Sequence, residues 1–151
     1  MATYRNITAD EMSAFLCVRG FQQVCIPDTV ELVFEKPVQY PGSSGRPLIG
    51  LVLRVYTGIN PNGQSRAVGK DAIRVCFFWD NKIIGASKRV HRVQGWRKNL
   101  DDRLSNWKEL LGPYCPRCGG LMVERHARKN KKYSFWGCMN YPTCNGFQPK
   151  N

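Results

Sequence analysis

Two segments of the chain each carry a pair of cysteines: Cys115-Pro116-Arg117-Cys118-Gly119-Gly120 and Cys138-Met139-Asn140-Tyr141-Pro142-Thr143-Cys144. Glycine and proline beside both pairs favour tight turns. A structural Zn²⁺ site is a closed tetrahedron of four ligands, which two turns with two thiolates each can supply. The alternative is that these cysteines form disulfides or are unrelated buried thiols. The spacing favours a zinc site formed by Cys115, Cys118, Cys138 and Cys144.

Three short motifs follow one another between residues 113 and 148: a Cys-Pro-x-Cys-Gly turn, an aromatic-x-Gly-Cys approach and an Asn-Tyr-Pro-x-Cys turn. Together they resemble the C-terminal zinc ribbons of bacterial type IA topoisomerases. The resemblance implies a zinc ribbon that binds DNA, especially single strands, through a basic and aromatic face. It does not imply topoisomerase activity, because the catalytic tyrosine of those enzymes lies in a large core for which this chain is too short. The long basic run 125–132 departs from the family pattern and would extend the hairpin tip.

The segment between the two cysteine pairs predicts a β-hairpin, with strands at 121–127 and 133–137. Alternation along the second strand would place Tyr133 and Phe135 on one face and Trp136 on the other. Exposed aromatic rings beside cations form a platform on which unpaired bases stack. The alternative is that all these rings pack around the metal site. The predicted nucleic-acid contacts here are Arg125, Arg128, Lys129, Lys131, Lys132, Tyr133, Phe135 and Trp136.

The first 112 residues predict an α+β domain. A capping box at Thr8 and Glu11 begins a short helix over 8–20. A second helix over 97–111 has an apolar stripe that would pack on a sheet. Short connections favour antiparallel pairing, and the strand-forming segments are 30–36, 48–56, 72–79 and 82–87. We therefore expect a four-stranded antiparallel sheet with flanking N- and C-terminal helices in residues 1–112, followed by a zinc ribbon in residues 113–151.

Residues 88–98 are the most basic stretch of the first domain and contain no acid. One interpretation is a solvated edge strand whose charges prevent aggregation. The other is a nucleic-acid surface on which cations contact phosphates and a tryptophan stacks on a base. This second interpretation predicts contacts at Lys88, Arg89, Arg92, Trp96, Arg97 and Lys98.

The charge of the chain favours a polyanionic partner. The 151 residues include 23 basic and 11 acidic side chains, a formal net charge of +12. Nucleic acid is therefore the first candidate and an anionic membrane surface the second. No apolar run is long enough to span a bilayer, and residues 1–6 lack the apolar core of a signal peptide. The free cysteines expected outside the zinc site fit a reduced, cytoplasmic location.

Catalysis is not expected. Hydrolytic metal centres need an open ligand position, which four thiolates do not leave on zinc. We expect a non-catalytic DNA-binding protein that favours single strands and serves replication, recombination or DNA processing by a phage or mobile element. Two alternatives stay open. The first is an adaptor whose ribbon docks a protein such as RNA polymerase or a nuclease. The second is a small metal-dependent nuclease that uses Asp28, Glu31, Glu35 and Asp71.

Overall fold

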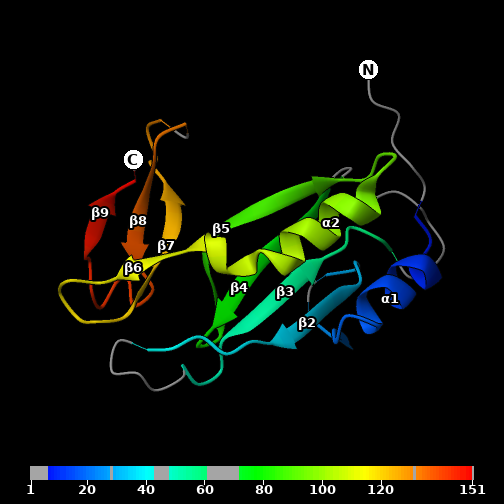
Figure 1. Cartoon of the computed structure of the whole chain (residues 1–151), viewed down its shortest axis with the longest axis horizontal. Coiled ribbons are helices and arrows are strands. Elements are labelled where there is room, and N and C mark those ends of the chain that lie inside the picture. The colour runs from blue at the N-terminus through cyan, green and yellow to red at the C-terminus, as the bar shows by residue number, and fades with distance from the viewer. Residues whose placement is uncertain (1–6, 28, 43–47, 61–71, 131, 151) are drawn as a thin grey trace.

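The computed structural model describes residues 7–27, 29–42, 48–60, 72–130 and 132–150 (Figure 1). These residues form two antiparallel sheets, with strand orders β1-β2-β3-β4-β5 and β6-β7-β8-β9. The predicted α+β class with antiparallel pairing is therefore confirmed. The elements in chain order are α1 (Ala9–Cys17), β1 (Gln22–Val24), β2 (Val33–Pro37), β3 (Val52–Tyr56), β4 (Ala72–Trp79), β5 (Lys82–His91), α2 (Trp96–Ser105), the 3-10 helix η1 (Trp107–Leu110), β6 (Leu111–Tyr114), β7 (Leu121–His126), β8 (Ser134–Cys138) and β9 (Phe147–Pro149).

The expected strand count of the first sheet was wrong, because its described residues form five strands rather than four. The additional edge strand β1 pairs antiparallel with β2, with Gln22 opposite Glu35 and Val24 opposite Val33. Gln22 and Gln23 are both exposed, so β1 lacks the apolar alternation by which strands are recognised in a sequence.

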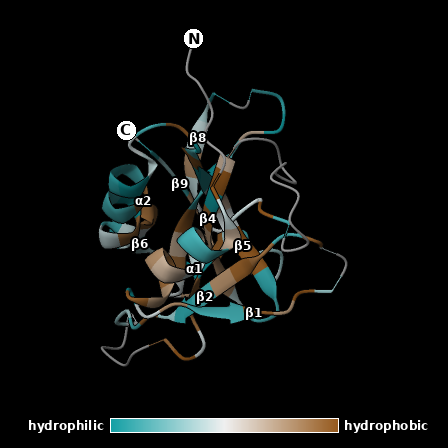
Figure 2. Cartoon of the chain, turned by 90° about the vertical axis from the view of Figure 1, so that its right-hand side faces the viewer, coloured by the Kyte–Doolittle hydropathy of each residue, from teal (hydrophilic) through white to brown (hydrophobic). Residues whose placement is uncertain are grey.

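Both α-helices pack against one face of the first sheet. Leu100 and Leu104 of α2 lie in the same buried cluster as Met12 and Leu16 of α1. The sheet contributes Phe34, Leu53, Val55, Ile73, Val75 and Phe77 to that cluster. Figure 2 shows the outward side of α2 and the edge strand β1 as hydrophilic, whereas other strands of the sheet carry hydrophobic segments. No helix in the described part of the chain is long and apolar enough to cross a membrane.

Local sequence signals explain where the elements begin and end. The Thr8 side chain accepts a hydrogen bond from the Glu11 N–H at 3.1 Å and caps α1. Gly20, with φ 88°, ends the helix in the left-handed conformation that glycine favours. Asp80 and Asn81 have φ values of 52° and 60°, which is the backbone of a two-residue hairpin turn between β4 and β5.

The ribbon packs directly against the first domain where β5 meets β7. Gly85 lies so close to β7 that an added Cβ would be 2.8 Å from the Cβ of Val123. The Lys82 ammonium donates a hydrogen bond to the Tyr141 carbonyl at 2.9 Å. The ribbon also contributes residues to the buried cluster of the first domain, namely Leu121, Val123 and Met139. These contacts fix the position of the ribbon against β5.

A buried carboxylate joins the two parts of the chain. Glu124 of β7 is 6% exposed and forms ion pairs with Lys88 of β5 and with Lys150. Burial alone would raise the pKa of Glu124, but the hydrogen bonds and charges of Lys150 and Lys88 outweigh it and hold this pKa below its ordinary value. A carboxyl with a lowered pKa stabilises the fold above its unfolded-state pKa, and this contribution is lost as the pH falls.

We expect Glu124→Gln to lower the free energy of unfolding by about 1–3 kcal/mol at pH 7, because it leaves two lysines without their carboxylate. The loss should shrink as the pH falls below about 4.3, where the unfolded-state carboxyl is protonated in the wild type as well. Urea unfolding between pH 3 and pH 8 measures both effects. The exposed carboxylate of Glu109, changed to glutamine, is the matched control, and an equal loss in both variants would contradict the role of Glu124.

Candidate metal centre and nucleic-acid interface

The four predicted cysteines meet at one point of the ribbon. Their Sγ atoms all lie within 4.8 Å of one another. The Sγ atoms of Cys115 and Cys144 are 3.7 Å apart, and those of Cys118 and Cys138 are 3.3 Å apart. Four Zn–S bonds of about 2.3 Å hold their sulfurs about 3.8 Å apart in a tetrahedron. The thiols are therefore close to the geometry that zinc requires, and no disulfide joins them.

Amide groups of the turns point at these sulfurs. The Asn140 side chain donates a hydrogen bond to Cys118 Sγ at 3.4 Å, and the Gly120 N–H donates another at 3.4 Å. These two donors lower the pKa of the Cys118 thiol to about 6. Burial raises the pKa of the Cys138 thiol to about 12, so a metal that binds there at neutral pH displaces a proton. Such N–H donors orient and stabilise thiolate ligands.

Two glycines shape the turns that carry the cysteines. Gly119 has φ 79° and turns the chain back after Cys118. An added Cβ at Gly146 would lie 2.4 Å from Cys115 Sγ, so a larger residue there would push this sulfur out of place. The Tyr141–Pro142 peptide bond in the second turn is cis. Among the described residues, the four cysteines are the only such cluster of metal-ligating side chains.

The comparisons with known proteins identify this module. Residues 112–150 match the family described as the topoisomerase DNA-binding C4 zinc finger. The match includes all four cysteines and covers the second sheet apart from its first residue. Residues 1–111 lie outside the match. No curated protein and no solved structure matched the chain. The predicted zinc ribbon is thus confirmed, and the four-thiolate geometry fits a bound Zn²⁺.

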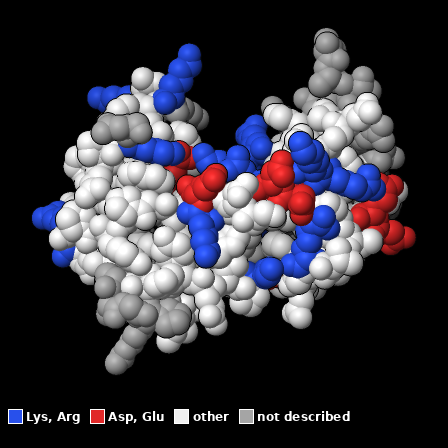
Figure 3. All heavy atoms as spheres, in the orientation of Figure 1, with Lys and Arg blue, Asp and Glu red and all other residues white. Residues whose placement is uncertain are grey.

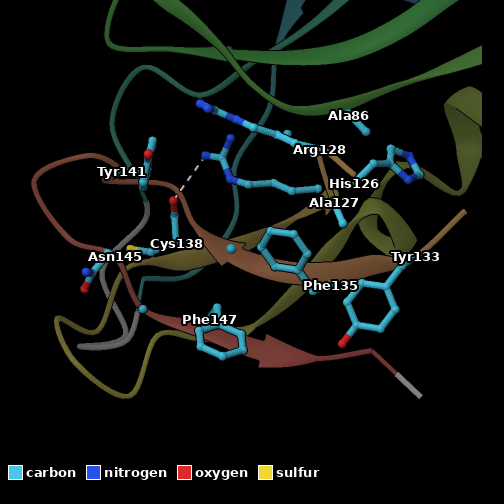
Figure 4. A pocket seen from close by; sticks show the side chains of 14 residues that line it. Ala86, His126, Ala127, Arg128, Tyr133, Phe135, Cys138, Tyr141, Asn145 and Phe147 are labelled. Carbon is cyan, nitrogen blue, oxygen red and sulfur yellow. Dashed lines mark hydrogen bonds between the residues drawn. The ribbon is translucent and has the colours of Figure 1, made fainter. Parts of the chain in front are cut away.

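An open groove of about 700 Å³ lies between this zinc ribbon and β5 (Figure 4). Gly85 and Ala86 of β5 line one side, and no Asp or Glu is among the described residues that line the groove. Figure 4 shows Phe135 in the centre of the view, with Phe147 on one side of it and Ala86 on the other. The ribbon contributes the cations Arg125 and Arg128 and the aromatic rings of Tyr133, Phe135, Tyr141 and Phe147.

The groove residues hold one another in place. The rings of Phe135 and Phe147 pack edge to face, with their centres 6.2 Å apart. The Arg125 guanidinium lies 5.6 Å from the centre of the Tyr141 ring and donates a hydrogen bond to the Cys138 carbonyl at 3.2 Å. Its stem crosses the backbone of β8 at Gly137, where a Cβ would lie 2.6 Å from Arg125 Cδ. A cation and aromatic rings thus line an open cavity.

Trp136 lies on the opposite face of β8, as alternation predicted. It pairs in register with Glu124, and its ring covers Gly112, where a Cβ would lie 2.4 Å from the ring. The Lys150 ammonium lies 4.8 Å from the ring centre. Trp136 therefore packs within the ribbon and does not share the platform of Phe135, so its expected stacking role is not supported by this placement.

The basic stretch 88–98 does not form one surface. Trp96 and Arg92 are each only 2% exposed, and the Trp96 ring packs 5.2 Å from the ring of Phe15. The expectation that Trp96 stacks on a base is corrected for this reason: it is the first residue of α2 and points into the core. Arg92 is likewise too buried to reach a phosphate.

The remaining cations of this stretch have different surroundings. Lys88 is ion-paired with Glu124, and Arg97 lies 3.3 Å from the carboxylate of Glu11. Arg89 and Lys98 are exposed. Figure 3 shows acidic side chains among the basic ones across this face of the molecule. Part of the stretch is an edge strand, since β5 extends to His91.

The cations of the ribbon tip are more accessible. Arg128, Lys129 and Lys132 are exposed, and Tyr133 is 51% exposed. The predicted contact at Lys131 lies outside the described residues. The ribbon tip and the groove therefore bring together exposed cations and the rings of Tyr133 and Phe135 that the sequence predicted as nucleic-acid contacts.

Sequence reasoning missed three groove residues as contacts. Tyr141 and Phe147 are 50% and 64% exposed and face the groove. The sequence offers only a weak indication of their role, namely that both are aromatic residues close to the cysteine turns. Ala86 carries no signal at all, because its place in the groove depends on how β5 packs against the ribbon.

The described carboxylates among those considered for a nuclease are held by ion pairs and hydrogen bonds. Glu31 is ion-paired with Arg74 and accepts a hydrogen bond from the Gly58 N–H at 2.9 Å. Glu35 accepts two hydrogen bonds from the Arg54 guanidinium, at 3.0 and 3.1 Å. Asp28 and Asp71 lie outside the described residues.

Proposed function

We propose that the chain is a non-catalytic DNA-binding protein that favours single strands and acts as an accessory to replication, recombination or the DNA processing of a phage or mobile element. The groove beside the zinc ribbon carries this proposal. It combines aromatic rings and arginines from a segment that matches a DNA-binding zinc-finger family, and its described lining residues include no acid. Rings stack on bases and arginines contact phosphates, and the two together suit an unpaired strand.

The bound Zn²⁺ would be held by the four cysteines and would supply folding energy rather than chemistry, because four thiolates close its ligand shell. The residues of the chain do the binding. Arg125, held across Gly137, would meet phosphate oxygens, and Phe135 and Phe147 would meet base faces. A preformed groove lowers the entropy cost of ordering these side chains on binding.

Binding of the zinc-loaded protein to fluorescent single-stranded and duplex DNA of one sequence, over a range of salt concentrations, tests the proposal. We expect tighter binding of the single strand and a linear fall of log affinity with log salt concentration, because phosphate contacts release counterions. No binding at low salt would contradict the proposal. Equal affinity for single strand and duplex would contradict its preference for unpaired bases.

A further inference from the structure

One wall of the groove belongs to the first domain, which lies outside the matched zinc-finger segment. Gly85 and Ala86 are residues of β5 and line the groove opposite the ribbon rings. Two contacts hold β5 in place against the ribbon. Gly85 packs closely against Val123, and Lys82 donates a hydrogen bond to the Tyr141 carbonyl at 2.9 Å. The width of the groove is therefore set by the contact between the two parts of the chain.

We propose that this groove is a two-domain site for one unpaired nucleobase and its adjoining phosphate, with Ala86 of β5 as one wall and the ribbon rings as the other. The proposal rests on the proposed function and adds that the first domain takes part in the contact. The size of the groove falls within the range of about 300–1,000 Å³ that is typical of small-ligand sites. The side chains that line the groove indicate which ligand would bind there.

The lining suits a flat, uncharged ring with a negatively charged group attached beside it. Phe147, 64% exposed, and Tyr141, 50% exposed, offer ring surface with no protein partner that covers it fully. Arg125 and Arg128 give the groove positive charge, and none of its described lining residues is an acid that would repel a phosphate. The small side chain of Ala86 leaves the space opposite these rings open. A base stacked there would place its phosphate near the arginines.

The proposal is tested in the full, zinc-loaded chain with two variants, each of which places one negative charge on a different face of β5. Ala86→Glu puts a carboxylate into the groove. Ser87→Glu makes the same change of net charge on the next residue, which is exposed and does not line the groove. Successive side chains of a strand point to opposite faces. We expect Ala86→Glu to weaken binding of single-stranded DNA at least about tenfold and Ser87→Glu to weaken it less than about threefold, with zinc content unchanged in both.

A second measurement asks whether a base is needed. An abasic strand of the same length keeps the phosphates but has no bases to stack, so we expect the wild type to bind it at least about tenfold more weakly. Equal binding of the two strands would overturn the nucleobase site. Equal effects of Ala86→Glu and Ser87→Glu would overturn the role of β5, while normal single-strand binding by the wild type would leave the proposed function standing. Failure of the wild type to bind any strand would overturn both.

Discussion

Replacing Cys138 with serine is expected to abolish stoichiometric zinc binding and to unfold the ribbon. Cys138 is buried, and its sulfur lies 3.3 Å from that of Cys118. Structural zinc contributes about 10–16 kcal/mol to the folding of small zinc fingers, far more than a module of this size gains from its own core. We therefore expect the amides of β7 and β8 to lose protection from hydrogen exchange and the affinity for single-stranded DNA to fall at least about a hundredfold.

The first domain should respond differently to the same change. Its sheet and helices share a core that does not depend on the metal, so the amides of β3 and β4 should stay protected. Loss of Leu121, Val123 and Met139 from that core would still lower its midpoint of unfolding. Cys17→Ser and Cys25→Ser are matched controls, because both thiols are exposed and lie outside the cluster. Native mass spectrometry should find one zinc ion per chain in both controls. A full zinc content in Cys138→Ser would contradict the four-cysteine site.

The zinc site could be predicted from the sequence because its geometry is local. Each pair of cysteines lies on one turn, and the turn-forming residues Gly119 and Pro142 lie close to them in the sequence. The hairpin that joins the turns is short, so few arrangements remain. The same holds for the Asp80-Asn81 turn, whose backbone conformation follows from the residue types.

The site beyond the metal could be predicted only in part, because it depends on packing between distant segments. Residues 88–98 contain charges and a tryptophan, but the sequence does not say which of them face the core. In the structure the Trp96 ring packs on Phe15, more than 80 positions earlier in the chain. The groove poses the same problem, since Ala86 becomes a wall only when Gly85 approaches Val123.

Truncation of the groove rings should give the second large effect. We expect Phe147→Ala and Phe135→Ala each to weaken binding of single-stranded DNA by about 5- to 150-fold, because stacking of one base on an aromatic ring contributes about 1–3 kcal/mol. Phe147 is 64% exposed, so its loss removes little packing from the fold. Phe135 and Phe147 contact each other at 6.2 Å between ring centres, so the double variant should lose less than the sum of the two single losses.

The control for these variants must remove an exposed ring that does not face the groove. Tyr114 meets this need: it is 39% exposed on β6, and its hydroxyl donates a hydrogen bond to the Pro41 carbonyl at 2.7 Å. We expect Tyr114→Ala to keep wild-type affinity within about threefold, since it leaves every groove contact intact. Zinc content, measured in all variants, separates a lost contact from a lost fold. A fall in affinity that follows zinc loss would assign the rings to the structure of the ribbon, whereas a fall with zinc retained assigns them to the bound strand.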